Sequence, residues 1–579
     1  MAEEKHISGP FVRDHWLWGS FYQNRSIYIQ VGLAAAFVNM LSLTSSLFIM
    51  TVYDRVVPNN AIESLIALSI GMAIALSADF ILKTLRGYFI DVAGQRLDYE
   101  IGSSLFRRVL DLKLSERKGS SGAFASVIRE FETLKEFFTS ATLVAFVDLP
   151  FIFLFLGVIA IIAGQVAWVP ILAVPIVIVT GFLIQPALAK LAGQGLSEGQ
   201  SKHGVLVETI AGLETVKSLG AGAMLEQRWR SGLKSHSTTS RRSRIITQFA
   251  VNVAGSVQQI AQVGTVIVGV FLISSGDLTV GGLIAAVILT GRALAPLAQL
   301  AQVLSRANGA LSSYKTLDNL MLQGGETDAE RSYLRRSKMD GKIEFKDVVF
   351  RYPGQTGRAL DSVSFTIEPG EKVAVLGKIG SGKSTITRLI LGLYEPDEGS
   401  VLVDDTDIRQ IMPSDLRQNI GSVLQDIYLF SGSIRDNITL GQGDIADEEL
   451  LRVAKLGGVH DFAGQLAAGY DLKLMDRGEG LSGGQKQSIA IARALAGKPP
   501  MLLMDEPSSA MDTGSENALL SRLEDEVKDR TLVLITHRAS LLKLVDKIIV
   551  FDKGRIVAQG PKDNVLKSMA VEGARRANQ

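Results

Sequence analysis

The chain has 579 residues, of which 47% are hydrophobic and 21% charged, and its mean hydropathy of +0.23 favours a membrane protein over a wholly soluble one. The formal net charge of +1 excludes the strongly basic balance typical of nucleic-acid-binding proteins, so no nucleic-acid partner is predicted. The absence of cysteine excludes disulfides, thiolate metal sites and cysteine catalysis.

Residues 1–26 have acidic residues near their start and no apolar core, so they do not resemble a signal peptide. Their aromatic cluster, which includes Trp16, Trp18 and Phe21, is typical of a helix lying at the membrane surface. The alternative is a partly disordered leader. We treat residues 1–26 as a leader or interfacial helix in front of the first apolar stretch.

Six apolar stretches are long enough to cross a bilayer, which takes about 20 residues. They cover about residues 27–52, 61–82, 142–163, 166–187, 249–275 and 279–300. The three short connections hold one basic residue, Arg55, whereas the two long connections, 83–141 and 188–248, are rich in Lys and Arg. The positive-inside rule therefore places the long connections and both termini in the cytoplasm. A soluble bundle of buried helices is the alternative, and this charge alternation disfavours it.

Apolar residues recur at helical spacing in both long connections. We therefore expect the spans to continue into the cytoplasm as long helices that turn at short elbows near 119–124 and 220–227. Residues 316–340 are polar, charged and glycine-flanked, as a linker is.

From residue 341 the pattern becomes that of a soluble α/β domain. "KIEFKDVVFRY" alternates as an edge strand would, and "KVAVLG", "MLLMDE" and "TLVLITH" are short apolar runs typical of buried parallel strands. The sequence thus predicts a membrane α-helical domain of six transmembrane helices (27–315), a linker (316–340) and a soluble α/β P-loop ATPase domain (341–579).

A strand, a glycine-rich loop and a helix follow one another around "GKIGSGKS" (377–384), which fits the phosphate-binding motif G-x-x-x-x-G-K-[ST]. The glycines let several backbone N–H groups face one phosphate, and the helix adds its positive N-terminal end. Lys383 should reach the β- and γ-phosphates of ATP, and Ser384 should ligate Mg²⁺. The predicted loop residues are Gly377, Gly380, Ser381, Gly382, Lys383, Ser384 and Thr385.

Two carboxylates end the apolar run "MLLMDEP" (501–507). At the carboxyl end of a buried strand, Asp505 should hold the magnesium and Glu506 should polarise the attacking water. The alternative for Glu506 is an ordinary surface carboxylate. His537, after the strand "TLVLITH", should also face the γ-phosphate, although a histidine satisfied at a strand end is the simpler interpretation.

Two further residues complete the predicted site. Tyr352 follows the first strand and could stack on the adenine. Gln425, in "SVLQDIYLF", could touch magnesium or water and sense the nucleotide.

A second glycine-rich segment, "LSGGQ" (481–485), lacks a lysine of its own. Taken in order with Tyr352, the 377–384 loop, Gln425, the Asp505–Glu506 pair, "SSAMD" (508–512) and His537, it resembles the ATPase domain of ABC transporters. Met511 is one small departure, since leucine is commoner there. The resemblance extends to the six spans and implies an ABC exporter fold.

This resemblance implies that "LSGGQ" binds the nucleotide of a second copy docked head to tail. Ser482, Gly483, Gly484 and Gln485 would then complete the partner's site, and the working unit is predicted to be a homodimer with two composite ATP sites. The elbows would rest in grooves on the ATPase domains and transmit their motion.

The membrane half resembles type I secretion ATPases of Gram-negative bacteria in "LFIMTVYDRVVPN" (47–59), in 129–151 and in "GRALAPLAQL" (291–300), most of all the branch that exports repeats-in-toxin adhesins. This implies an inner-membrane protein that exports unfolded polypeptides with a periplasmic adaptor (membrane fusion) protein and an outer-membrane channel. Members of this branch often carry an N-terminal peptidase-like domain, which the leader is too short to hold. The alternatives are export of lipid or amphiphilic small molecules, and an ATPase that regulates without transport.

Arg292 lies within the last span, about 20 Å along its helix. A lipid-facing arginine at this depth is costly. It could contact an acidic translocating polypeptide, or it could pair with Asp148 or snorkel toward the cytoplasmic edge. Asp79 and Lys83, one turn apart, are predicted to form a local pair at a helix end.

Overall fold

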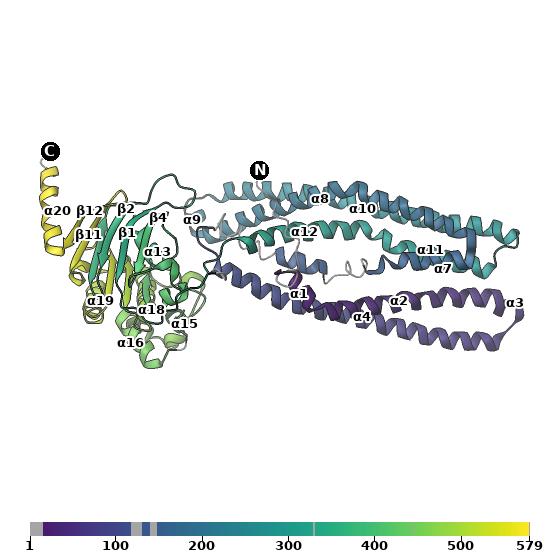
Figure 1. Cartoon of the computed structure of the whole chain (residues 1–579), viewed down its shortest axis with the longest axis horizontal. Coiled ribbons are helices and arrows are strands. Elements are labelled where there is room, and N and C mark those ends of the chain that lie inside the picture. Colours follow the sequence, from purple (N-terminus) through teal and green to yellow (C-terminus); the bar gives the residue numbers. More distant parts are fainter. Residues whose placement is uncertain (1–14, 117–129, 139–146, 328–330, 444, 578–579) are drawn as a thin grey trace. The chain divides into compact units, whose positions relative to one another are not determined.

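The computed structural model describes residues 15–116, 130–138, 147–327, 331–443 and 445–577. They form two compact units (Figure 1). Residues 1–110 and 118–323 make a helical unit, and residues 111–117 and 324–579 make an α/β unit.

Long helices dominate the helical unit (Figure 1). They are α2 (Arg25–Thr51), α4 (Ile62–Asp111), α7 (Phe151–Ala163), α8 (Trp168–Ala211), α10 (Gly222–Ser274), α11 (Val280–Ala298) and α12 (Leu300–Leu322). The shorter elements are α1 (Trp18–Gln23), a π-helical turn (Val52–Val56), α3 (Val57–Asn59), a 3₁₀ turn (Gly164–Ala167) and α9 (Leu213–Ser218).

Five helical stretches among the described residues are long and apolar enough to cross a membrane. Four of them hold one predicted span each, and the fifth, Phe151–Ala211, holds two. The 3₁₀ turn at Gly164–Ala167 separates these two, because Gly164 leaves the helical conformation with φ 53°. The predicted start of the third span, at 142, lies outside the described residues.

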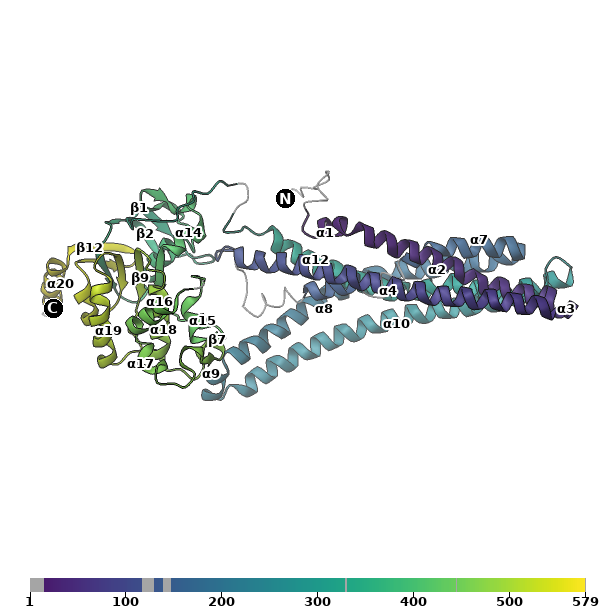
Figure 2. The same ribbon diagram turned by 90° about the horizontal axis from the view of Figure 1, so that it is seen from below.

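The expectation of long helices beyond the spans is confirmed. Helix α4 has 50 residues, α8 has 44 and α10 has 53, so each is far longer than a bilayer requires. Helices α8 and α10 lie side by side (Figure 2), and the chain turns between α9 and α10 at Gly220, which has φ +64°. The other predicted elbow, 119–124, lies outside the described residues.

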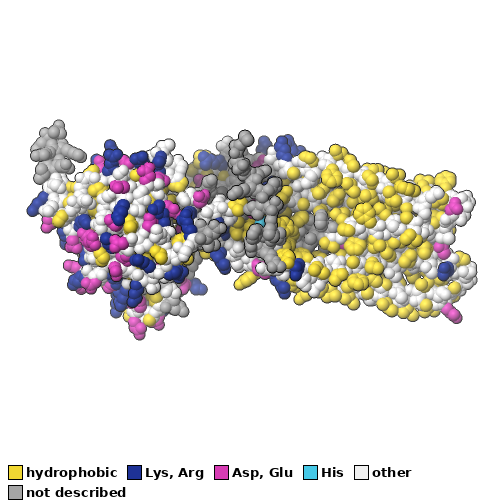
Figure 3. All heavy atoms as spheres, viewed as in Figure 1, with side chains coloured by type: hydrophobic (Ala, Val, Ile, Leu, Met, Phe, Trp, Pro, Cys, Tyr) yellow, Lys and Arg dark blue, Asp and Glu magenta, His cyan; other side chains and the backbone are white. Residues whose placement is uncertain are grey.

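The surface of the helical unit is strongly apolar. Hydrophobic side chains cover most of its visible face (Figure 3), and Phe80, Phe153 and Phe182 are each more than 70% exposed. An apolar surface of this extent is unfavourable in water and suits lipid. The same figure shows a mixture of acidic and basic side chains on the α/β unit.

Asp79 and Lys83 form the predicted local ion pair, with Lys83 Nζ 2.7 Å from Asp79 Oδ2. The pair lies within α4 rather than at a helix end, because the helix continues to Asp111. The sequence could not show this, since the apolar stretch ends near residue 82 although the helix does not.

The predicted pairing of Arg292 with Asp148 is wrong. Asp148 is bonded by Arg86 instead, with Nη1 3.1 Å from Oδ1. The side chain of Arg292 lies against α2 and donates hydrogen bonds there to the carbonyl oxygen of Ser42 and to Ser45 Oγ (2.8 Å). The guanidinium therefore ties α11 to α2 through neutral acceptors.

The N-terminal aromatic cluster packs partly on protein. Trp16 stacks on Tyr314 of α12 with ring centroids 5.8 Å apart, and its Nε1 donates to Asp318 Oδ1 at 2.9 Å. Leu17 is 2% exposed, whereas Trp18 is 45% exposed. Only some of the aromatic side chains in this segment are therefore exposed and able to contact a membrane surface.

The α/β unit contains two main sheets. The antiparallel sheet has the order β2 (Leu360–Ile367), β1 (Ile343–Phe350), β4 (Glu398–Val403), β5 (Thr406–Asp407), and β7 (Gly432–Ser433) pairs with β8 (Lys473–Leu474). The larger sheet has the order β12 (Arg555–Pro561), β11 (Lys547–Asp552), β3 (Lys372–Gly377), β10 (Thr531–Ile535), β9 (Met501–Asp505), β6 (Ile420–Val423). The predicted edge strand, β1, is internal because β2 and β4 pair with its two sides; its alternation reflects one buried face.

Helices surround the larger sheet, and both of its faces are buried. Val373 and Val375 of β3 join one buried cluster, and Ala374 joins the other, because successive side chains point to opposite faces. The helices are α13 (Lys383–Ile390), α14 (Pro413–Gln418), α15 (Ile434–Thr439), α16 (Asp447–Gly457), α17 (His460–Ala463), α18 (Gly483–Leu495), α19 (Thr513–Glu526) and α20 (Lys562–Ala577). Short 3₁₀ turns lie at Ile408–Gln410, Gly469–Asp471, Asp476–Gly478 and Ala539–Leu544.

Candidate nucleotide site

Four neighbouring parallel strands bring the predicted catalytic residues to one edge of the larger sheet. Strand β10 pairs in parallel with β3 and β9, and β6 pairs in parallel with β9. The loop that starts at Gly377 follows β3, His537 follows β10, Asp505 ends β9, and Gln425 follows β6. Since carboxyl ends of parallel strands meet at one edge, residues scattered over the sequence become neighbours there.

The phosphate-binding loop has a backbone that its glycines make possible. Gly382 caps α13 with φ +98°, and a Cβ there would lie 2.5 Å from the carbonyl oxygen of Ala359. Lys383 Nζ donates to the carbonyl oxygens of Gly377 and Lys378, each at 2.8 Å. The ammonium group is therefore held across the loop, where a phosphate chain would lie.

Polar atoms inside this loop fit a phosphate and a hard cation. Ser381 is 2% exposed, and its Oγ has no hydrogen-bond partner among the described residues. The side chain of Ser384 lies near the Asp505 carboxylate and acts to lower the pKa of that carboxyl. A hydroxyl and a carboxylate oxygen are ligands that Mg²⁺ accepts. The residues present thus suit ATP with magnesium.

Asp505 is 3% exposed at the end of β9. Burial raises its pKa above the usual range, and the charge of Glu506 acts in the same direction, whereas Ser384 and Lys383 oppose the shift. The ionised carboxylate is thus disfavoured in the folded protein until a cation compensates it.

Replacing Asp505 by Asn should raise the thermal midpoint of the full-length protein by about 2 °C at neutral pH without nucleotide. A carboxyl whose pKa is raised in the folded protein stabilises the fold at pH values below its unfolded pKa of about 3.9, and this stabilisation is lost as the pH rises through the folded pKa. At neutral pH the buried charge of Asp505 therefore no longer favours the folded state, and Asn removes that charge. The same variant should lose the additional stabilisation that Mg²⁺ gives beyond ATP alone. Differential scanning fluorimetry measures both, and a lower midpoint without nucleotide would contradict the burial argument.

Glu506 combines an unusual backbone with a free carboxylate oxygen. Its φ of 53° lies in the left-handed region, which is uncommon outside glycine and is found at functional sites. Oε1 lies 2.7 Å from His537 Nδ1, and Oε2 is buried without a hydrogen-bond partner among the described residues. The side chain of His537 is 73% exposed. One carboxylate oxygen is thus oriented by histidine, and the other is buried and has no partner among the described residues.

Tyr352 lies against the loop helix. Its hydroxyl is 3.1 Å from Thr385 Oγ1 and accepts a hydrogen bond from Arg388 Nη1 at 2.8 Å. The ring meets Phe350 and Tyr394 edge-on. The structure thus places Tyr352 beside α13, and stacking on adenine stays a prediction. Gln425 is exposed and has no hydrogen bond to another described residue, so its side chain is available for the predicted contact with magnesium or water.

The "LSGGQ" segment forms a separate helix start. Ser482 Oγ accepts from Gln485 N at 3.3 Å, and Gln485 Oε1 accepts from Ser482 N at 2.8 Å, which together make a capping box on α18. A Cβ at Gly483 would lie 2.8 Å from Ala510 Cβ, so this glycine allows close packing on the 508–512 loop. Among the described residues, no hydrogen bond joins 481–485 to the loop 377–384. The second glycine segment thus does not complete the first within one chain.

Comparison with known proteins identifies the family. A model of the ABC transporter transmembrane region matches residues 28–295, and an ABC transporter model matches residues 360–509. The chain is 32% identical over 571 residues to the exotoxin translocation ATP-binding protein PaxB of Pasteurella aerogenes, which covers 98% of the chain and 80% of that protein. The chain belongs to the ABC transporters of the type I secretion family.

Other relatives extend this result. The leukotoxin translocation ATP-binding protein LktB of Mannheimia glucosida is 32% identical over 554 residues, 96% of the chain and 78% of that protein. The structure of a bacterial Atm1-family ABC exporter with ATP bound matches with a TM-score of 0.86 and 26% identity, over 96% of this chain and 98% of that one. The chain is therefore a multi-pass membrane ABC exporter with an ATP-hydrolysing domain.

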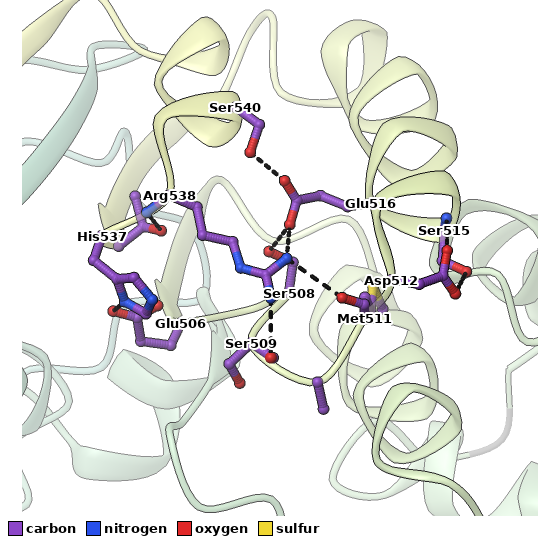
Figure 4. Close-up of polar contacts among 12 residues, drawn as sticks. Glu506, Ser508, Ser509, Met511, Asp512, Ser515, Glu516, His537, Arg538 and Ser540 are labelled. Atoms are coloured by element: carbon purple, nitrogen blue, oxygen red, sulfur yellow. Dashed lines mark hydrogen bonds and ion pairs between the residues drawn. The ribbon is translucent and has the colours of Figure 1, made fainter.

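This ABC exporter also has a buried ion pair that its sequence does not predict. Glu516 of α19 is 5% exposed and receives hydrogen bonds from Arg538, Ser540 and Ser508 (Figure 4). Arg538 also donates to the carbonyl oxygen of Ser509 at 3.1 Å. The network joins the 508–512 loop to the residue beside His537. The sequence carries no signal for it, since these residues belong to separate elements.

The hydrogen bonds determine the charge state of Glu516. Burial by itself raises the pKa of this carboxyl, but the hydrogen bonds from Ser540, Arg538 and Ser508 outweigh it and lower the pKa below the usual range. The carboxylate is therefore ionised at neutral pH and holds the arginine in place.

Replacing Glu516 by Gln should destabilise the α/β unit by about 2 kcal/mol at neutral pH, because charge-assisted hydrogen bonds are lost. A carboxylate whose pKa is lowered in the folded protein stabilises the fold at pH values above its unfolded pKa of about 4.3, and this stabilisation is lost as the pH falls through the folded pKa. The difference in stability between the wild type and Glu516→Gln should therefore shrink in acid. Hydrogen exchange of 508–512 should accelerate as well. The exposed Glu448→Gln variant is the control; equal protection of 508–512 in both variants would contradict the assignment.

Proposed function

We propose that this ABC exporter moves unfolded polypeptides across the bacterial inner membrane as the ATP-driven component of a type I secretion system. The observation that carries the proposal is the 32% identity over 571 residues, across both units, to a protein named for exotoxin translocation. A periplasmic adaptor (membrane fusion) protein, an outer-membrane channel and the lipid bilayer are the proposed partners. In this proposal residues 27–315 form the six-helix transmembrane domain and residues 341–579 hydrolyse ATP.

The site residues have distinct proposed roles. The loop 377–385 and Lys383 bind the phosphates, Tyr352 stacks on the adenine, and Ser384, Gln425 and Asp505 hold Mg²⁺, which screens phosphate charge when bound. Glu506 Oε2 orients a water molecule and accepts its proton as the water oxygen bonds to the γ-phosphorus and the bond to the ADP oxygen breaks. His537 keeps Glu506 in place, as their 2.7 Å contact supports.

A second copy of the chain supplies the missing half of each site. The capping box of Ser482 leaves the N–H groups of Gly483 and Gly484 at the positive end of α18, which suits a γ-phosphate. Since 481–485 makes no hydrogen bond to its own loop among the described residues, we assign it to the partner's ATP. Binding of ATP then closes the dimer, and hydrolysis releases it.

Proteoliposomes containing the purified full-length chain test the function. An unfolded polypeptide added on the ATPase side should stimulate hydrolysis and become protected from protease in the lumen when ATP is present. The Glu506→Gln variant cannot turn over ATP, so it should not protect the polypeptide cycle after cycle. Protection that requires turnover is thereby distinguished from adsorption of the polypeptide to the vesicles. Stimulation by lipid or amphiphile but not by any polypeptide would instead support small-molecule export.

A further inference from the structure

A basic pocket lies in the helical unit. It has a volume of about 500 Å³ and lies between α10 and α12. Arg241 and Arg244 of α10 line it together with Arg306 of α12, and the amides of Gln248 and Gln302 add hydrogen-bonding groups. Two helices thus contribute guanidinium and amide groups to one hollow.

The two arginines of α10 have charges that the chain does not neutralise. Arg241 and Arg244 are exposed, and neither has an ion pair or a hydrogen bond to another described residue. The next basic residue, Arg242, does not line the pocket. The pocket thus presents arginines that are free to bind an anion, and Arg242 provides a matched control for net charge.

The depth of the pocket places it at the cytoplasmic edge of the headgroup layer. Helix α10 ends at Ser274, at the far end of its apolar stretch, and Arg241 is 33 residues before that end. At about 1.5 Å per residue the separation along the helix is about 50 Å, whereas a whole bilayer with headgroups is about 40–45 Å thick. Arg241 therefore lies on the cytoplasmic side, just beyond the headgroup layer, and Arg244, about 45 Å from Ser274 by the same count, lies at the edge of that layer.

A row of exposed amides continues from the pocket toward the membrane. Gln248, Asn252 and Gln259 are exposed on one face of α10, and Gln248 Nε2 donates to Asn252 Oδ1 at 2.9 Å. In lipid such side chains would be costly. Primary amides both donate and accept, as the backbone of an extended polypeptide does. The face therefore suits a wet path for a peptide chain.

We infer that the Arg241–Arg244 pocket is a docking site for acidic stretches of an unfolded polypeptide at the cytoplasmic side of the membrane. The inference rests on the proposed export function and specifies its cargo. Arginine binds carboxylates through paired, charge-assisted hydrogen bonds, so Asp and Glu side chains are the matching groups. The amide row then receives the backbone without selecting its sequence.

The test uses the full-length protein in phosphatidylcholine nanodiscs and two fluorescent, unstructured peptides of about 20 residues. One contains Gly, Ser and Asp; in its twin every Asp is Asn. Fluorescence anisotropy should show at least about 20-fold weaker binding of the acidic peptide to R241Q/R244Q than to the wild type. Binding of the Asn twin should not change, and R242Q should bind both peptides as the wild type does. Equal melting temperatures of the variants and the wild type control for folding.

Several results would overturn the inference. One is undiminished binding of the acidic peptide by R241Q/R244Q. Another is an R242Q variant that loses as much affinity for the acidic peptide as R241Q/R244Q does. A third is an equal loss of affinity of R241Q/R244Q for the Asn twin. A difference seen only with phosphatidylglycerol in the nanodiscs would assign the arginines to lipid instead. Failure of the export function is distinguishable, because the wild type would then protect neither peptide in proteoliposomes. If the wild type and R241Q/R244Q export both peptides equally, export stands and this site does not.

Discussion

Replacing Glu506 by Gln should lower ATP turnover by about 10³-fold while ATP still binds. The amide has nearly the same shape as the carboxylate, so it preserves the unusual backbone at φ 53°, but it cannot accept a proton from water. Steady-state phosphate release measures the loss of turnover. Filter binding of radiolabelled ATP should show that the nucleotide is retained and leaves slowly, as a closed dimer that cannot hydrolyse requires.

The exposed Glu524→Gln variant is the matched control and should turn over ATP at the wild-type rate. His537→Ala should also slow hydrolysis, because Glu506 Oε1 loses the partner that lies 2.7 Å away. Normal turnover by Glu506→Gln would require a different group to activate water.

Mixing two variants that cannot retain ATP by themselves should restore ATP trapping, which is the slow release of bound ATP expected of Glu506→Gln. In a Glu506→Gln background, Lys383→Ala removes the loop lysine, and Ser482→Arg blocks the start of α18. A head-to-tail dimer of the two variants has one site with both defects and one site with neither. Random assembly at equal amounts makes half of the dimers mixed, so about a quarter of all sites should trap ATP.

Each variant alone should trap almost none, which is the reference for the mixture. A blend of separately reconstituted variants, which cannot exchange subunits, should also trap none. If the co-assembled mixture stays at that level, each chain builds its own site and the proposed dimer is wrong.

Local sequence patterns predicted much of this molecule because they report local physics. The loop 377–384 needs glycine where a Cβ at Gly382 would lie 2.5 Å from a carbonyl oxygen, and that requirement is visible as a motif. The spans are visible because lipid demands about 20 apolar residues. The strand that ends at Asp505 is visible because all five of its residues, Asp505 included, are buried.

Contacts between distant elements could not be predicted in this way. Arg292 meets Ser42 and Ser45, and Asp148 meets Arg86, because the positions of α2, α4 and α11 decide which partner is within reach. The placement of β1 inside its sheet depends on two partners, β2 and β4, that lie elsewhere in the chain.

The class of the chain could be predicted from its residues alone, because its apolar runs require a bilayer and its phosphate loop is accompanied by two carboxylates after a buried strand. The contact of Glu506 with His537, the link from Glu516 through Arg538 to the 508–512 loop, and the arginines of α10 that face a pocket became known only from the folded arrangement. The difference comes from the distance over which each interaction acts. Backbone conformation and burial leave local patterns, whereas a side chain's partner depends on elements that folding brings together.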